Sequence, residues 1–271
     1  MSLFALLLFL TLLYFSYHPS LQFLFPLLCG TTICAGLWEF YYIAKEKGFQ
    51  PLGSIGILFS ALFIIAVYIN AKNNTFNALP AAILWSFLIT SFLYYFIQGS
   101  DPFVNLALTL FGFFYLTVPL SSVLYINYSL SPTLSPDGRW WVLFTLAVTK
   151  NTDVGAYISG KLLGSNKMTP YISPKKTWEG AIGGMLTGII TSLILTWAIP
   201  LPLNFPIALI LGALISGLAQ FGDLAESLLK RDGGVKDSNQ LPGLGGMLDV
   251  LDSLIFTAPF VYLFLKFYGG F

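Results

Sequence analysis

The chain has 271 residues, of which 56% are hydrophobic, 17% are aromatic and only 9% are charged. Its formal net charge is +1, so the chain as a whole offers no attraction for nucleic acid, and no nucleic-acid partner is expected. Long uncharged runs exclude an ordinary soluble core and place the chain among integral membrane proteins.

Apolar runs separated by glycine, proline and charged residues predict about nine membrane-spanning helices. The expected spans are roughly 2–17, 21–44, 51–71, 78–97, 103–127, 140–163, 178–199, 206–229 and 250–267. Because a backbone in lipid must satisfy its own hydrogen bonds, the expected fold is polytopic and all-α. The first run has no basic n-region and no small-residue cleavage site, so it is expected to be a retained helix.

Lysine and arginine gather in the loops on one side of the expected membrane. The loops after the second, sixth and eighth spans contain Lys45, Lys47, Lys167, Lys175, Lys176, Lys230, Arg231 and Lys236. Basic loops stay in the cytoplasm during insertion, so this side is expected to be cytoplasmic. The expected location is therefore the cell (inner or plasma) membrane.

Charge also divides the chain along its length. Residues 149–252 hold sixteen of the 25 formal charges, and several of these fall inside expected helices. We therefore expect residues 1–148 to form a transmembrane scaffold. Residues 149–271 are expected to form a catalytic transmembrane region with a polar pocket that faces the cytoplasm.

Acidic residues recur at helical spacing in the last two expected spans. Asp223, Glu226 and Lys230 are spaced i, i+3, i+7, which places them on one face of a helix. Acids at membrane depth cost at least a few kcal/mol each unless they are paired, hydrated or bound to a cation. Alternatively, these residues have only a structural role, in which Glu226 pairs with Lys230 and Asp223 is hydrated. Asp249 and Asp252 share a face at the start of the ninth span, where helix capping explains only one of them.

The sixth span has its own polar face. Asp153, Tyr157 and Lys161 lie at i, i+4, i+8, and Asn151 lies close by. This spacing places Asp153, Tyr157 and Lys161 on one face of a helix.

A basic loop, "SNKMTPYISPKKTWEG", follows the sixth span. Thr177 is expected to begin the seventh helix, with Glu179 in its first turn. Lys175 and Lys176, behind Ser173 and a rigid proline, would suit a phosphate-rich ligand. Alternatively, these lysines serve only to set the orientation of the protein in the membrane.

The types of side chain present bear on which metal could bind. Carboxylates without histidine or cysteine favour Mg²⁺, which together with lysines commonly handles nucleotide phosphates. His18 is the only histidine, and Cys29 and Cys34 match neither a redox pair nor a zinc knuckle. "GAYISGKL" is not a P-loop, because Leu162 replaces the metal-binding Ser/Thr and the stretch lies within an expected helix.

Several ordered motifs resemble the phosphatidate cytidylyltransferase (CDP-diacylglycerol synthase) family. "LWEFY" at 37–41, "TDVGAYISGKLLG" at 152–164, "SPKKTWEG" at 173–180 and "GDLAES" at 222–227 are similar to family motifs. The family's C-terminal signature is matched by Ser227, Leu229, Lys230, Arg231, Lys236, Asp237, Pro242, Gly243, Gly245, Gly246, Asp249 and Asp252. Leu244 stands where the family usually has His, and Val250 where it usually has Arg.

The resemblance implies an enzyme that makes CDP-diacylglycerol and pyrophosphate from CTP and phosphatidate at the bilayer. It implies Mg²⁺, with a second cation as an option, and a homodimer. The nucleophile is already an anionic lipid phosphate, so positioning and charge neutralisation would suffice for catalysis.

The resemblance also implies roles for individual residues. The implied metal ligands are Asp223, Asp249 and Asp252. The implied catalytic cations are Lys230, Arg231 and Lys236. The implied substrate-binding residues are Asn151, Asp153, Lys161, Ser173, Lys175, Lys176 and Asp237.

Other functions remain open at this stage. An ion-coupled transporter also carries intramembrane acids beside lysines, although here the charges gather at one face and in one half. A CTP-dependent polyprenol kinase or a CDP-archaeol synthase shares much of the chemistry. A CDP-alcohol phosphotransferase is disfavoured, because its D-G-x-x-A-R pattern is missing.

Overall fold

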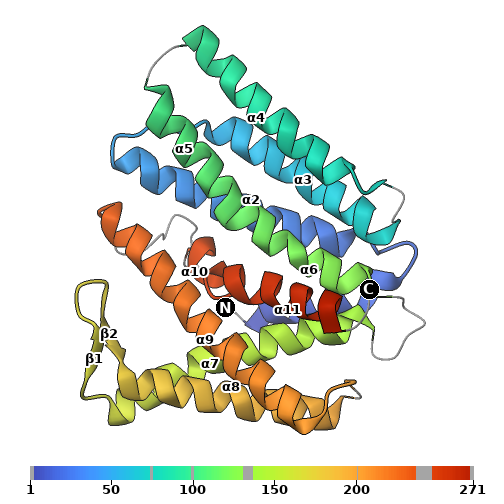
Figure 1. The fold of residues 1–271 in the computed structure, drawn as a ribbon, viewed down its shortest axis with the longest axis vertical. Helices are drawn as coiled ribbons and strands as arrows, with labels where there is room; N and C mark the ends of the chain where they lie inside the picture. The colour runs from blue at the N-terminus through green and yellow to red at the C-terminus, as the bar shows by residue number, and fades with distance from the viewer. Residues whose placement is uncertain are drawn as a thin grey trace. The chain divides into compact units, whose positions relative to one another are not determined.

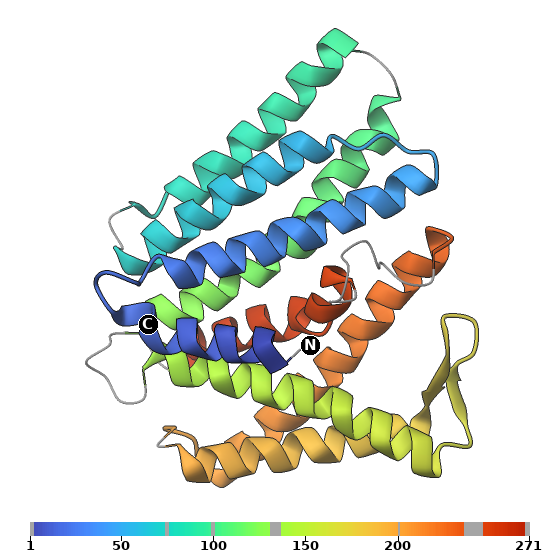
Figure 2. The same ribbon diagram turned by 180° about the vertical axis from the view of Figure 1, so that it is seen from behind.

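A computed structural model describes residues 3–73, 76–98, 101–130, 137–199, 201–235 and 246–268 (Figures 1 and 2). The chain divides into two compact units. Unit 1 comprises Met1–Ser129 and Asp232–Leu251, and unit 2 comprises Leu130–Arg231 and Asp252–Phe271.

Unit 1 is a bundle of helices. Its elements are α1 (Leu3–Tyr14) with a 3₁₀ turn (Phe15–Tyr17), α2 (Leu24–Glu46), α3 (Gly53–Lys72), α4 (Leu79–Gln98), α5 (Pro102–Gly112), a π-helical segment (Phe113–Thr117), α6 (Val118–Tyr128) and α10 (Met247–Leu251). Helices α3 and α4 lie side by side in both views (Figures 1 and 2).

The π-helical segment joins α5 and α6 into one continuous helix. Val118 donates its backbone N–H to the carbonyl of Phe113, five residues earlier. The next residue, Pro119, has no N–H to donate, so the regular ladder cannot continue across this turn. The wider turn places Phe113 in a ring cluster, with its ring centroid 4.7 Å from that of Phe87 and 5.5 Å from that of Phe63. This cluster forms the aromatic core of unit 1.

Unit 2 contains the remaining elements. They are α7 (Gly138–Leu163), β1 (Lys167–Thr169), β2 (Ser173–Thr177), α8 (Trp178–Ala198), α9 (Phe205–Asp232, whose last residue is assigned to unit 1) and α11 (Leu254–Tyr268). The strands pair as an antiparallel hairpin beside the adjoining ends of α7 and α8 (Figures 1 and 2).

Helices α7 and α8 pack closely because glycine lies at their contact. A Cβ atom at Gly184 would lie 2.9 Å from the carbonyl oxygen of Thr152 and 2.9 Å from the Cβ of Ala156. No side chain fits there without a backbone shift. The close packing sets the position of the hairpin that joins the two helices.

The expected all-α polytopic fold is confirmed, but the count of nine spans is not. Among the described residues, seven helices are long and apolar enough to cross a membrane. Helix α1 has only 12 residues, and α7, which carries Lys150, Asp153 and Lys161, is not among the seven. The basic loop after the sixth span is also more ordered than expected, because it forms the β1–β2 hairpin.

Candidate active site

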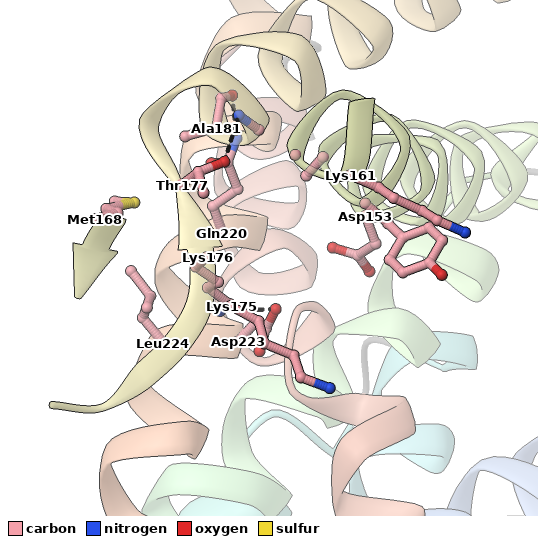
Figure 3. A pocket seen from close by; sticks show the side chains of 14 residues that line it. Asp153, Lys161, Met168, Lys175, Lys176, Thr177, Ala181, Gln220, Asp223 and Leu224 are labelled. Carbon is pink, nitrogen blue, oxygen red and sulfur yellow. Dashed lines mark hydrogen bonds and ion pairs between the residues drawn. The ribbon is translucent and has the colours of Figure 1, made fainter. Parts of the chain in front are cut away.

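A cavity of about 410 Å³ opens in unit 2 between α7, the hairpin, α8 and α9 (Figure 3). Its charged lining residues are Asp153, Lys161, Lys175, Lys176 and Asp223. All five were expected from the sequence to belong to the site, so the fold brings together residues up to 70 positions apart in the chain.

An ion pair between α9 and β2 crosses this cavity. Lys176 Nζ lies 2.8 Å from Asp223 Oδ2, and the two side chains remain 25% and 36% exposed. Lys175 of β2 lines the same cavity (Figure 3). A partly exposed pair can exchange its partner for a ligand at low cost, because a pair in contact with water is worth about 1 kcal/mol or less.

A second polar network lies between α7 and the start of α11. Lys150 Nζ donates to Ser253 Oγ at 2.9 Å, and Ser253 Oγ donates to Asp153 Oδ2 at 3.1 Å. Asp252 is buried, and its carboxylate interacts electrostatically with those of Asp153 and Asp223. Three carboxyl groups therefore influence one another here, and a bound cation would relieve the repulsion between their negative forms.

The hairpin is anchored at its base by Glu179. This carboxylate accepts hydrogen bonds from Ser165 Oγ at 2.8 Å and Asn166 Nδ2 at 2.7 Å, as well as from both backbone N–H groups. Thr177 caps α8 by accepting a bond from the N–H of Gly180 at 3.2 Å, so the expected start of the seventh helix is confirmed. Helix α8 and the hairpin are thus fixed to each other beside the cavity.

Lys230, expected to be a catalytic cation, is buried in an ion pair. Its Nζ lies 2.8 Å from Glu226 Oε2, and the two side chains are 10% and 1% exposed. This is the Glu226–Lys230 pairing that the sequence offered as an alternative to a functional role. Neither residue lines the cavity.

Five more expected residues lie outside the cavity lining, namely Asn151, Ser173, Arg231, Asp249 and Asp252. Arg231 Nε donates to the backbone carbonyl of Ile172 at 3.0 Å and so joins the end of α9 to the hairpin. Ser173 begins β2 opposite Thr169, and Asn151 is exposed on α7. Lys236 and Asp237, together with Leu244, lie outside the described residues.

The described residues also contribute groups that sequence reasoning did not assign. Gln220 lines the cavity and donates to the carbonyl of Ala181 at 3.1 Å. Lys150 and Ser253 orient Asp153, as described above. Gln220 lies three residues before Asp223 on the same helical face. This spacing could have identified Gln220 from the sequence as a residue of the site.

The donors around the cavity suit a hard cation. Asp153, Asp223 and Asp252 offer carboxylate oxygens, the ligands that Mg²⁺ prefers. Among the described residues, no three acidic, histidine or cysteine side chains converge closely enough to form a metal cluster. Asp249 lies in α10, which belongs to unit 1.

Comparison with known proteins identifies the family. A model of the cytidylyltransferase family matches residues 1–268. The chain belongs to the cytidylyltransferase family. The resemblance seen in the sequence motifs is therefore confirmed, and it extends to the N-terminal half of this cytidylyltransferase.

Curated relatives align along nearly the whole of this cytidylyltransferase. The phosphatidate cytidylyltransferase of Chlamydia pneumoniae is 34% identical over 269 residues, which cover 94% of this chain and 86% of the relative. The phosphatidate cytidylyltransferase of Staphylococcus haemolyticus is 32% identical, with 88% and 92% covered. The one from Synechocystis is 30% identical, with 86% and 85% covered.

Proposed function

We propose that this cytidylyltransferase transfers CMP from CTP to phosphatidate, giving CDP-diacylglycerol and pyrophosphate. The observation that carries the proposal is the near-complete alignment with phosphatidate cytidylyltransferases. The names of these relatives describe nucleotidyl transfer, so they do not favour a transporter or a polyprenol kinase.

The cavity supports this reaction through its cations. Lys161, Lys175 and Lys176 present three ammonium groups, which suit the negative charge of a triphosphate. The ion pair with Asp223 holds the Lys176 ammonium group at the cavity wall. These cations neutralise charge on the β- and γ-phosphates and so stabilise the departing pyrophosphate.

The chemical step needs no nucleophile from the protein. An anionic oxygen of the phosphatidate headgroup attacks the α-phosphorus of CTP and forms the new P–O bond. The bond between the α-phosphorus and the bridging oxygen breaks, and pyrophosphate leaves with that electron pair. No proton has to be abstracted from the attacking oxygen, so the protein acts by aligning the two substrates and by stabilising charge.

Carboxylates would hold the cation that this chemistry requires. We assign Asp223 and Asp252 to Mg²⁺, with a second cation as an option, and Asp249 stays a ligand that the family resemblance implies. When bound, the ion would polarise the phosphoryl oxygens and offset their charge. Asp153, oriented by Ser253, would complete the polar wall.

The protein is a multi-pass membrane protein, with seven helices among the described residues that are able to cross a bilayer. We place it in the plasma membrane as a homodimer, with the cavity open to cytoplasmic CTP. The basic hairpin supports this orientation, because Lys167, Lys175 and Lys176 lie on it together. Phosphatidate would enter from the bilayer.

Purified protein in phosphatidate-containing liposomes provides the test. With CTP and Mg²⁺, pyrophosphate release and CDP-diacylglycerol formation should proceed at equal rates. Replacing phosphatidate with a polyprenol should abolish both. Turnover with the polyprenol but not with phosphatidate would contradict the proposal.

A further inference from the structure

A second cavity, also of about 410 Å³, lies wholly within unit 1. It shares no lining residue with the candidate active site. Its polar lining side chains include Lys45, Gln50, Ser54, Tyr94, Gln98 and Asn105. The proposed nucleotidyl transfer gives no role to this cavity.

The cavity lies where membrane-spanning helices begin and end. Helices α2 and α4 end beside it, and α3 and the continuous α5–α6 helix begin beside it. All four are long and apolar enough to cross a membrane, so their ends lie at the depth of the lipid headgroups. The last turn of α4 also exposes Phe96 and Ile97, which are 78% and 85% exposed and can contact acyl chains. The cavity is therefore within reach of a lipid headgroup.

The lining of the cavity suits an anion. Of the described residues that line it, Lys45 alone carries a charge, and none is acidic. Ser54 adds a hydroxyl group. Tyr94 donates its hydroxyl proton to Gln98 Oε1 at 2.6 Å, so the Gln98 amide has its NH₂ group left to donate to a ligand. One cation among neutral donors, without a carboxylate, is typical of a phosphate-binding site.

The loop between α2 and α3 is held in place before any ligand binds. The backbone N–H of Gln50 donates to Asn105 Oδ1, and that of Leu52 donates to Thr109 Oγ1, both at 2.8 Å. Asn105 and Thr109 are buried, and Pro51 restricts the backbone between the two bonds. A wall that is already ordered lowers the entropy cost of binding a ligand.

We propose that this cavity binds the phosphate group of an anionic ligand, with Lys45 as its cationic contact and Ser54 and Gln98 as hydrogen-bond donors. A phospholipid headgroup is the favoured source of the phosphate, because the helix ends and the exposed apolar side chains of α4 adjoin the cavity. A soluble phosphate offers the same chemistry. The site needs neither CTP nor turnover, so this inference goes beyond the proposed function and can fail independently of it.

The test measures how a ligand protects the cavity from a thiol reagent. Ser54→Cys is introduced into the full-length chain with Cys29 and Cys34 replaced, and its labelling rate is followed in detergent. The probes are a short-chain phosphatidylglycerol, inorganic phosphate and a neutral diacylglycerol of the same chain length. Phosphatidylglycerol should slow the labelling. The control is Lys47→Cys, because Lys47 is exposed and does not line the cavity.

The contribution of Lys45 is measured by adding Lys45→Met or Lys47→Met to the Ser54→Cys chain. Both changes remove one positive charge from the same part of the chain. Losing a hydrogen bond to a charged group lowers affinity by roughly tenfold to a hundredfold. Lys45→Met should therefore need that much more phosphatidylglycerol for equal protection. Lys47→Met should behave as the parent chain does, because Lys47 pairs with Asp232 instead.

Protection by phosphatidylglycerol but not by inorganic phosphate would assign the site to a lipid headgroup. Protection by inorganic phosphate as well would assign it to a phosphate anion of either source. The proposal would be overturned if neither protects, if the neutral diacylglycerol protects equally well, or if Lys45→Met and Lys47→Met lose affinity equally. Thermal unfolding checks that each variant is folded, and Gln98→Cys replaces Ser54→Cys if the latter does not fold.

Discussion

Asp223 and Lys176, which both line the cavity, form an ion pair whose partial exposure leaves both side chains accessible to a ligand. The Glu226–Lys230 pair one turn along α9 is almost fully buried. The two ion pairs that involve α9 therefore differ in their access to ligands. We therefore propose a role in the reaction for the first pair and a structural role for the second.

Asp223→Asn keeps the shape of the side chain but removes its charge. If Asp223 holds the cation, CDP-diacylglycerol formation should fall by about 100-fold or more. The control is Asp232→Asn, since Asp232 forms an exposed ion pair with Lys47 in unit 1 that contributes little to stability. Liposome turnover assays measure both variants, and similar rates for the two would contradict the role of Asp223.

Lys176→Met removes an ammonium group from the cavity and keeps much of the side-chain volume. Because this charge should stabilise the departing pyrophosphate, we expect kcat/KM for CTP to drop by about 100-fold. Lys167→Met is the matched control, because Lys167 is exposed on the same hairpin and does not line the cavity. Steady-state kinetics of the two variants test this prediction, and an equal effect of both would indicate a general role of hairpin charge.

At the scale of elements, the hairpin and the α7–α8 contact position the cavity lysines. Glu179 fixes the base of the hairpin, and glycine allows α7 and α8 to approach. At Gly184 of α8, the neighbouring backbone of α7 leaves no space for an added methyl group.

Gly184→Ala should therefore destabilise unit 2. The added methyl would lie 2.9 Å from the Thr152 carbonyl oxygen, so the helices must separate, at a cost of about 1–3 kcal/mol. Gly217→Ala on α9 is the control, because a Cβ atom there meets nothing within 4 Å and alanine favours helix. Thermal unfolding in detergent should show a lower midpoint for the first variant alone, and equal midpoints would disprove tight α7–α8 packing.

The elements show how far sequence reasoning reaches. Long apolar runs predicted the helices, because burial in lipid demands both length and apolarity. The hairpin escaped prediction because its strands have only three and five residues and include Pro174, so no alternating pattern appears. Spacing on α7 and α9 identified Asp153, Lys161 and Asp223, which do line the cavity. The contact of Glu39 with α10 could not be read locally, since it joins residues 208 or more positions apart.

At the scale of the whole molecule, the basic loops predict which membrane face carries the hairpin. A single cysteine at exposed Tyr171, in a chain with Cys29 and Cys34 replaced, should react with an impermeant maleimide only from the cytoplasmic side. A cysteine at exposed Pro202, beyond α8, should react only from the opposite side. Labelling of intact cells and of inverted vesicles measures this, and the reverse pattern would refute a cytoplasmic site.

We conclude that the protein transfers the CMP group of CTP to phosphatidate. The most direct measurement follows CTP labelled in parallel at the α- or the γ-phosphorus, incubated with reconstituted protein, Mg²⁺ and phosphatidate. We expect the α label in CDP-diacylglycerol and the γ label in pyrophosphate, in equal amounts. Transfer of the γ label to lipid, or no labelled lipid at all, would contradict it.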